Sequence, residues 1–325
     1  MSVALNILIL SKPLQSSSNI VFAKLYNKLP LLTILCLSTI FLIACNPQTE
    51  TALSASASAA PEETITNSSE VDKFGIQKIY PTKQGGREWF LNMDNPLLDN
   101  NFAITFDENI TRQDEGSWNI SGRAVRLNVN TPPNLSQWKN VEITGYAKIN
   151  EVLSDTNSTV KDEDLSWYAR GGRHNAKVPC EATAYIGGIY VDGSVGWKKE
   201  IWFIGGYTDE KGADKVTTPI IGRWIGWKVI MYNINNDTAV KLESYIDNTN
   251  TNFWIKVSDL VDDGGWYSKS NDSEFFSAGC DRDKDFVVTN GGPVVTFRSD
   301  NLTWEFKDLS IREIDPGTNT KQADS

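Results

Sequence analysis

The chain has 325 residues, 40% of them hydrophobic, and its 31 basic and 41 acidic side chains give a net charge of −10. This length allows one large domain or two small ones, and 11 Trp, 10 Tyr and 13 Phe supply material for a core. Because an acidic surface repels nucleic acid and anionic lipid, we expect no nucleic-acid partner, and an anionic polymer would need a local basic groove.

The first 44 residues are predicted to be an export signal. Lys12, Lys24 and Lys28 precede an apolar run that ends in "LIAC" at Cys45. This ending resembles the bacterial lipobox, in which the cysteine becomes the lipidated first residue after cleavage. A transmembrane anchor is the alternative, but the apolar run is short and passes directly into the polar "NPQTE". We therefore expect a lipoprotein that is exported and bound to the membrane of the cell envelope through lipid on Cys45, at the outer membrane if the cell has one.

The rest of the chain divides by composition. Residues 45–72 contain no aromatic side chain and are rich in Ala, Ser, Thr and Glu, which predicts a flexible tether. A folded domain is expected over residues 73–316, followed by a polar tail at 317–325. Removal of residues 1–44 leaves 28 basic against 41 acidic side chains, a net charge of −13.

Two cysteines remain after processing. Cys36 leaves with the signal and Cys45 carries lipid, so Cys180 and Cys280 are left. Two cysteines in an exported protein most simply form one disulfide. A two-cysteine metal site is the alternative, but it lacks histidine partners because His174 is the only histidine of the chain.

Alternation with a period of two dominates the folded part. The stretch "NVEITGYAKI" places Ile143 and Ala147 on one face and Glu142 and Tyr146 on the other, which predicts a strand. Similar strands are expected at residues 122–130, 181–193, 198–208, 223–233, 239–247, 293–300 and 304–314. No stretch predicts a convincing amphipathic helix. Eight or more antiparallel strands favour an all-β, two-sheet antiparallel β-sandwich.

Three stretches carry a resemblance to a known fold family. The order of "SQWKNVEITGYAKI", "GRWIGWKVIMYN" with "VKLESYID", and "VTFRSDNLTWEFKDLSIREI" resembles the concanavalin A-like jelly roll of laminin G-like, lectin and polysaccharide-degrading domains, over residues 74–315. The resemblance implies that one sheet is concave and carries a carbohydrate groove. It implies no particular enzyme, because the E-x-D-x-x-E string of its glycosidases and the R-[ST]-E-x-R and Q-[IV]-H strings of its alginate lyases are absent.

Residues 166–185, "SWYARGGRHNAKVPCEATAY", supply groups for a polysaccharide lyase. Such an enzyme abstracts the proton next to a uronate carboxylate, neutralises that carboxylate and protonates the leaving oxygen. The candidates are His174 as base, Arg170 and Arg173 as neutralisers, Tyr168 or Tyr185 as acid, and Lys198, Lys199 and Glu200 facing the same groove. The alternative is that "GGRHN" is a solvated turn whose arginines pair with surplus carboxylates.

Aromatic and cationic side chains predict a binding face. Trp and Tyr stack on the apolar faces of sugar rings, although alternation sends about half of the aromatics into the core. The residues expected to contact carbohydrate are Tyr146, Lys148, Tyr168, Lys198, Trp202 and Arg298.

An acidic run offers a weak metal prediction. Asp281, Asp283 and Asp285 have the spacing that opens a calcium loop, but an EF-hand would continue with Gly where this chain has Phe286 and with Glu where it has Gly292. Structural calcium is one interpretation and a solvated acidic turn is the other.

These patterns together predict an envelope lipoprotein whose jelly-roll domain binds or helps to process polysaccharide. One alternative is a polysaccharide lyase that cleaves a uronate polymer by β-elimination. The other is a structural or adhesive envelope protein that recognises a protein partner. Convergence of Arg170, His174, Tyr185, Glu200 and Arg298 in one groove would favour an enzyme.

Overall fold

A computed structural model describes residues 70–105, 109–153, 163–203 and 206–317. The chain divides into two units, Met1–Thr64 and Ile65–Ser325, and every described residue belongs to the second. The predicted signal at 1–44, nearly all of the tether at 45–72 and nearly all of the tail at 317–325 lie outside the described residues. No helix within the described ranges is long and apolar enough to cross a membrane.

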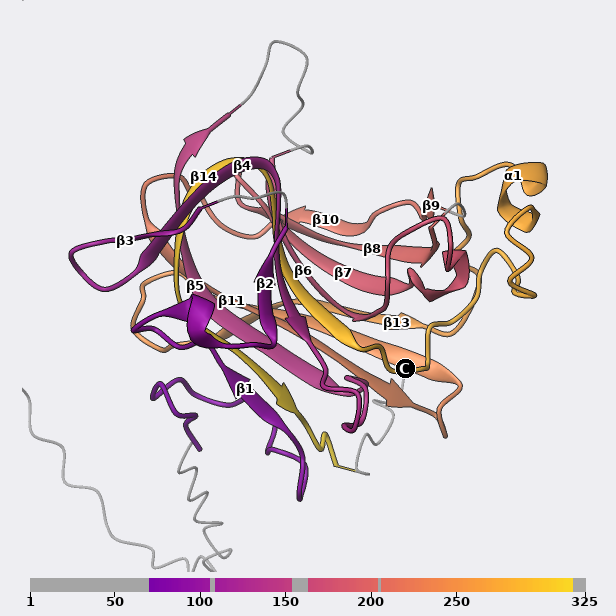
Figure 1. Cartoon of the computed structure of the whole chain (residues 1–325), viewed down its shortest axis with the longest axis horizontal. Helices are drawn as coiled ribbons and strands as arrows, with labels where there is room; N and C mark the ends of the chain where they lie inside the picture. Colours follow the sequence, from indigo (N-terminus) through magenta and orange to yellow (C-terminus); the bar gives the residue numbers. More distant parts are fainter. Residues whose placement is uncertain (1–69, 106–108, 154–162, 204–205, 318–325) are drawn as a thin grey trace, which may run out of the picture. The chain divides into compact units, whose positions relative to one another are not determined.

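The described strands form one 14-stranded antiparallel sheet that bends at β14 into two layers, which Figure 1 shows and which are called here the first and the second sheet. The first sheet contains β2 (Phe102–Ile104), β4 (Trp118–Asn130), the first part of β14 (Val294–Glu313), β6 (Asp164–Gly171), β7 (Ala184–Tyr190), β8 (Ser194–Trp202), β9 (Gly206–Tyr207) and β10 (Lys211–Lys215). The second contains β1 (Glu88–Phe90), the last part of β14, β5 (Val141–Val152), β11 (Trp224–Ile234), β12 (Ala239–Asp247) and β13 (Ile255–Asp262). The short β3 (Thr111–Arg112) pairs with β4, the 3-10 turns are η1 (Pro96–Leu98) and η3 (Pro179–Glu181), and α1 spans Asp272–Phe276.

Strand β14 belongs to both sheets. Its residues 294–300 pair with β6, and its residues 302–313 pair with β5. Between the two parts, Asn301 has a φ of 55°, and farther along Asp308 has a φ of 56° at a register shift. Asn and Asp adopt the left-handed conformation more readily than most residues, and such irregularities bend a strand. The sequence predicted two strands here, and the structure joins them into one bent strand of 20 residues.

The core lies between the sheets and follows the predicted alternation. In β4, Val125, Leu127 and Val129 are buried in the core, whereas Arg126 and Asn128 point to the opposite face. Apolar side chains from both sheets interdigitate in this way, as expected for packed antiparallel sheets. The predicted all-β, two-sheet antiparallel jelly-roll sandwich is confirmed.

The outer face of the second sheet is covered by the segment that precedes β1. The backbone N–H of Ile79 donates to Glu142 Oε2 at 3.2 Å, and the same carboxylate binds Lys228 Nζ at 2.7 Å and Arg312 Nη2 at 2.6 Å. Burial raises the pKa of Glu142, but the two cations outweigh burial and hold the pKa below its ordinary value. This face is therefore a closed polar layer, and the first sheet carries the open face.

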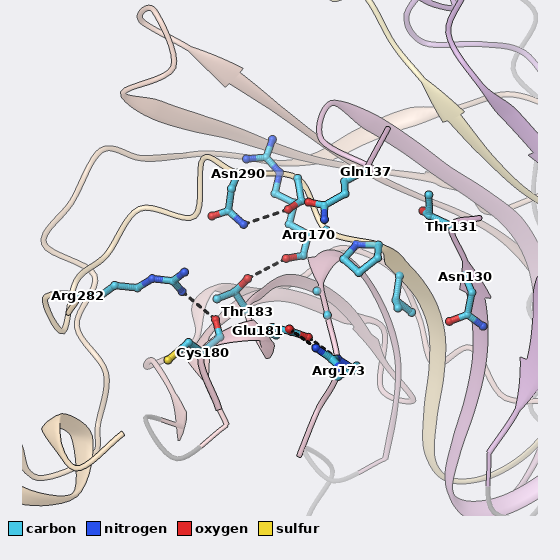
Figure 2. A pocket seen from close by; sticks show the side chains of 16 residues that line it. Asn130, Thr131, Gln137, Arg170, Arg173, Cys180, Glu181, Thr183, Arg282 and Asn290 are labelled. Carbon is cyan, nitrogen blue, oxygen red and sulfur yellow. Dashed lines mark hydrogen bonds and ion pairs between the residues drawn. The ribbon is translucent and has the colours of Figure 1, made fainter. Parts of the chain in front are cut away.

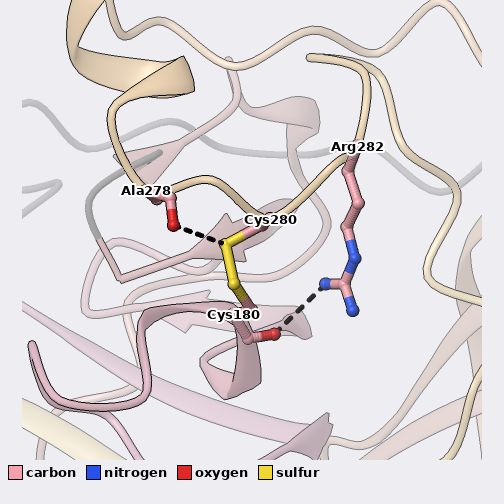
Figure 3. The surroundings of a disulfide bond; sticks show 4 residues. All are labelled: Cys180, Ala278, Cys280 and Arg282. Carbon is pink, nitrogen blue, oxygen red and sulfur yellow. Dashed lines mark hydrogen bonds between the residues drawn. A yellow bond between two sulfur atoms is a disulfide. The ribbon is translucent and has the colours of Figure 1, made fainter.

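One disulfide joins two loops beside the first sheet. Cys180 and Cys280 are bonded with a Cα–Cα distance of 5.5 Å across a sequence separation of 100 residues. Figure 3 shows this bond with Arg282 beside it, whose guanidinium donates to the carbonyl of Cys180 at 3.2 Å. The predicted disulfide is confirmed, and it links the loop after β6 to the loop before β14.

Candidate functional site

A groove of about 500 Å³ opens on the face of the first sheet that points away from the core. Strands β4, β6, β8 and β14 contribute alternate side chains to its floor, because side chains on a strand alternate between faces. The residues on this floor are Arg126, Asn128, Tyr168, Glu200, Thr296 and Arg298, with His174 and Tyr207 at its side.

Two arginines flank one aspartate on the groove floor. Asp300 accepts a hydrogen bond from Arg126 Nη1 at 3.2 Å and forms an ion pair with Arg298. Burial disfavours the charge of Arg298, but Asp300 outweighs burial and raises the pKa of the guanidinium. Its buried Nε has no hydrogen-bond partner among the described residues. Asp164, whose pKa burial raises to about 6, also acts on Arg298, so the two guanidinium groups lie beside two acidic side chains below the groove.

The only histidine of the chain is paired with a carboxylate. His174 Nε2 lies 2.7 Å from Glu200 Oε1, and the His174 ring packs edge-on against Phe203 at 4.7 Å. The hydrogen bond to Glu200 raises the pKa of His174 above its ordinary value, although partial burial opposes this effect. The Glu200 side chain is 8% exposed and that of His174 is 53% exposed, so the carboxylate anchors a ring that solvent and ligands can reach.

Two tyrosines complete the groove. Burial raises the pKa of Tyr168, while Arg126 and a hydrogen bond with Thr296 act in the opposite direction. Burial and the carboxylate of Glu200 raise the pKa of Tyr207, and Arg298 opposes them. Tyr207 is 39% exposed, so its phenol is accessible to a ligand. Both phenols are uncharged hydrogen-bond donors at neutral pH.

A second pocket of about 490 Å³ adjoins the groove. Figure 2 shows its lining, in which Arg173 and Glu181 pair below the site and Arg282 approaches from the neighbouring loop. Arg173 donates to both oxygens of Glu181, at 2.7 and 2.5 Å. Lining residues shared with the groove include Asn130, Gly172 and Arg173, so the two cavities lie side by side.

The charge of this surface differs from the charge of the whole chain. Five arginines but two glutamates line the groove and the pocket together: Arg126, Arg170, Arg173, Arg282, Arg298, Glu181 and Glu200. The chain as a whole carries −10. The structure therefore contains the local basic groove that an anionic polymer would require.

Of the predicted catalytic group, the structure brings His174 and Glu200 together with Arg298 in the groove. Tyr185 is buried in the core instead, where its hydroxyl donates to Asp262 Oδ2 at 2.6 Å. Lys199 Nζ reaches the same Asp262 oxygen at 2.8 Å, and both side chains are fully buried. The predictions that Tyr185 acts as an acid and that Lys199 faces the groove are therefore wrong, because both point between the sheets.

The predicted carboxylate neutralisers are also engaged elsewhere. The guanidinium of Arg170 is buried and donates to the carbonyls of Lys139 and Val288 and to Asn233 Oδ1. Arg173 lines the groove but holds Glu181 with two hydrogen bonds. Arg126 and Arg298 take the neutralising position in the groove.

The predicted carbohydrate contacts divide between the two sheets. Tyr168 and Arg298 lie in the groove as expected. Tyr146 lies on the covered face of the second sheet and donates to Asp247 Oδ2 at 3.0 Å, and Lys148 pairs with Glu305 at 2.8 Å on the same sheet.

Two further predicted contacts lie on β8 but outside the groove. Trp202 is fully buried against Phe275 of α1, with ring centroids 4.0 Å apart. Lys198 lies over the ring of Tyr190 at 5.5 Å and is not a lining residue. The expectation that Tyr146, Lys148, Trp202 and Lys198 line the groove is wrong.

The acidic run does not assemble as a metal site. In the parts of the chain that the structure describes, no group of three or more His, Cys, Asp or Glu side chains is placed to hold a metal ion. Asp285 instead accepts a hydrogen bond from the backbone N–H of Gly265 at 2.9 Å. Asp281, Asp283 and Asp285 thus do not form a cluster of three carboxylates, and structural calcium stays a prediction. The predicted lipidation residue Cys45 lies outside the described residues.

Several groove residues were missed at the sequence level. Arg126 and Asn128 alternate with the apolar residues of β4, so their face was readable from "GRAVRLNVN". Thr296 follows the same logic in β14, where its hydroxyl donates to Asn128 Oδ1 at 2.8 Å. Tyr207 was misplaced because unbroken alternation over the predicted strand 198–208 puts it on the face opposite to Glu200, whereas the structure ends β8 at Trp202 and begins the separate strand β9 at Gly206. Arg282 lies in a loop, where alternation predicts nothing.

Comparisons with known proteins were made on sequence and on structure. No protein-family model matches the chain, and no curated protein matches it. Among solved structures, the chain is similar to a Bacillus subtilis protein of unknown function with a galectin-like fold (8% identity, 70% of this chain and 98% of that chain covered, TM-score 0.40). It is also similar to a basic lectin of winged bean (9%, 71% and 100%, TM-score 0.39) and to endo-β-1,4-glucuronan lyase of the fungus Trichoderma reesei (6%, 67% and 93%, TM-score 0.38). With TM-scores below 0.5, these likenesses add no argument for a function.

Proposed function

We propose that this domain binds an acidic polysaccharide, a polymer that contains uronate residues, along the groove of the first sheet. The observation that carries the proposal is the set of five arginines against two glutamates that line the groove and its adjoining pocket, in a chain of net charge −10. The planar guanidinium presents its N–H donors in a fork that matches a carboxylate, so a row of arginines favours a polymer with a repeating carboxylate.

The aromatic lining also favours an acidic ligand over a neutral one. Besides His174, the aromatic side chains that line the groove are those of Tyr168 and Tyr207. No tryptophan lines it. A lining without tryptophan offers less aromatic surface for stacking on a neutral sugar ring. In this proposal the polar groups of Asn128 and Thr296 form hydrogen bonds with sugar hydroxyls, and Arg298 binds the carboxylate. Lipid on Cys45 would hold this domain at the cell envelope, where such polymers are met.

Calorimetric titration with two hexasaccharides of the same linkage, one of uronate and one of the neutral parent sugar, tests the proposal. We expect the uronate ligand to bind and the neutral ligand to bind at least tenfold more weakly. Arg298→Gln should weaken uronate binding about tenfold, since a charge-assisted hydrogen bond is lost. Arg112→Gln is the matched control, because Arg112 donates one hydrogen bond to the carbonyl of Asp94 outside both cavities. Equal affinity for the two hexasaccharides would contradict the proposal.

A second candidate function, cleavage of the bound polymer by β-elimination, is favoured by the hydrogen bond between His174 and Glu200. With Nε2–H donated to Glu200, Nδ1 of His174 carries the lone pair that accepts the proton from C5 of the uronate. The electron pair of that C–H bond forms the C4=C5 double bond, and the bond from C4 to the glycosidic oxygen breaks. Tyr207 donates a proton to the leaving oxygen, and Arg298 stabilises the charge that develops on the carboxylate.

Product absorbance distinguishes cleavage from binding. Elimination creates a double bond conjugated with the carboxylate, so ultraviolet absorbance should rise with wild-type protein. His174→Ala and Tyr207→Phe should each reduce this rate at least a hundredfold, because each removes a proton-transfer group. Binding of the polymer without any rise in absorbance would reduce the function to recognition, and full activity in His174→Ala would remove this histidine from the mechanism.

A further inference from the structure

Arg282 is a half-buried cation without a carboxylate partner among the described residues. Its guanidinium donates to the carbonyl of Cys180 at 3.2 Å and lies over the ring of Phe286 at 4.5 Å. Asp281 and Asp283 flank it in sequence, but neither lines the pocket. Burial lowers the pKa of Arg282, and a guanidinium still carries its charge at neutral pH. One backbone carbonyl leaves most of its five N–H donors available to a ligand.

A second arginine strengthens the positive charge of the same pocket from below. Arg170 lines it, and the acceptors of its guanidinium are neutral: two backbone carbonyls and the amide oxygen of Asn233. Burial lowers the pKa of Arg170 to about 10, so it is charged at pH 7. Its buried Nη2 has no hydrogen-bond partner in the described part of the chain. Asp237 is the carboxylate that acts on Arg170, and it is itself paired with Lys139 at 2.9 Å, so the guanidinium still favours an anion in the pocket above it.

Neutral polar groups surround these cations. Figure 2 shows Asn130 and Thr131 on one side of the pocket, Gln137 and Asn290 near Arg170, and Arg282 on the opposite side. The side chains of Asn130, Gln137 and Asn290 are exposed, so their amides can donate to and accept from sugar hydroxyls. The lining thus combines positive charge with amides, which suits a sugar that carries an anionic group.

The disulfide fixes this arrangement. Cys180 lies on one wall of the pocket, and its partner Cys280 is two residues before Arg282. Figure 3 shows that the bond brings the carbonyl of Cys180 next to the guanidinium. Because the covalent link holds both loops, Arg282 is presented to a ligand in one position and less ordering is required on binding.

We propose that the pocket around Arg282 is a second subsite, which binds the carboxylate-bearing sugar residue of the polymer that follows the residues in the groove. This inference rests on the proposed function and extends it, because the two cavities share Asn130, Gly172 and Arg173 and therefore adjoin. A polymer in the groove therefore continues into the pocket, where its next carboxylate meets Arg282.

Calorimetry with uronate oligosaccharides of two lengths tests this subsite. A disaccharide is too short to occupy both cavities, whereas a hexasaccharide extends through them. We expect wild type to bind the hexasaccharide more tightly, and Arg282→Gln to weaken hexasaccharide binding about tenfold. Arg282→Lys, which keeps the charge, should recover part of the loss. Arg112→Gln is the matched control, and thermal unfolding verifies that each variant is folded.

The outcomes separate the subsite from the function itself. A loss of hexasaccharide affinity in Arg282→Gln, together with unchanged affinity in Arg112→Gln, supports the subsite. Hexasaccharide binding by Arg282→Gln equal to that of wild type overturns the subsite and leaves the binding groove intact. Equal losses of hexasaccharide affinity in Arg282→Gln and Arg112→Gln also overturn the subsite, because a general effect of removing one positive charge then explains both losses. If wild type binds no uronate oligosaccharide, the proposed function fails and the subsite fails with it.

Discussion

Removal of the disulfide is the most quantitative prediction of this structure. Replacement of Cys180 and Cys280 by serine opens a loop with a sequence separation of 100 residues. On the chain-entropy model, such a crosslink stabilises the folded state by about 4–5 kcal/mol through restriction of the unfolded chain. For a domain of about 250 residues, each kcal/mol corresponds to about 2–4 °C, so the melting temperature should fall by about 10–20 °C.

Guanidinium unfolding of the double variant, compared with oxidised wild type, measures this loss. The slope of the unfolding free energy against denaturant concentration should become steeper, because the unfolded chain without the crosslink exposes more surface. The variant should bind a uronate hexasaccharide more weakly, since Arg282 is no longer held beside the carbonyl of residue 180. A stability within 1 kcal/mol of wild type would refute the loop-closure reasoning, and unchanged hexasaccharide affinity would refute the role of the disulfide in the pocket.

Three further predictions concern charged groups. Lys199→Met leaves the fully buried Asp262 without its cation. Urea unfolding should show that the variant is less stable than wild type by about 3–5 kcal/mol. A loss of stability below about 1 kcal/mol would contradict this. Glu200→Gln should lower the pKa of His174 in an NMR titration, since the carboxylate raises it. Because that pKa is raised in the folded state, the pair stabilises the fold fully below the unfolded pKa, and the effect disappears as pH rises through the folded pKa. The stability difference between Glu200→Gln and wild type should therefore narrow with rising pH, and a constant difference would contradict the linkage. Arg298→Gln should reduce the salt dependence of uronate binding, and an unchanged dependence would exclude contact with the carboxylate.

The fold was predictable because its causes are local. Alternation identifies the strands, and the aromatic content indicates a large core between two sheets. The single bent strand β14 was read as two, since the left-handed conformation of Asn301 does not interrupt hydrogen bonding on both sides of it. The disulfide was predicted from the expected processing, because Cys180 and Cys280 are the cysteines that would remain in an exported chain.

The site was predictable only in part, because alternation defines two faces of a strand without saying what covers each face. Tyr146 has the expected orientation, but its ring packs against Trp254 and its hydroxyl donates to Asp247. Trp202 follows Glu200 with the expected spacing, yet Phe275 of α1 covers it. These contacts join residues that are distant in sequence, and a strand pattern contains no information about them. His174 lies in a loop, and its pairing with Glu200 became visible only in three dimensions.

The NMR signal of His174 provides the most direct test of the central claim, that the groove of the first sheet binds an acidic polysaccharide. This is the only histidine of the chain, and it lies in the groove next to Glu200, so its ring resonances report on that site alone. Titration with a uronate hexasaccharide should shift these resonances in a saturable manner, with the same Kd as calorimetry, and the neutral hexasaccharide should require at least tenfold higher concentrations for the same shift. Calorimetric binding of the uronate ligand without any shift of the His174 signal would place the ligand elsewhere and contradict the claim.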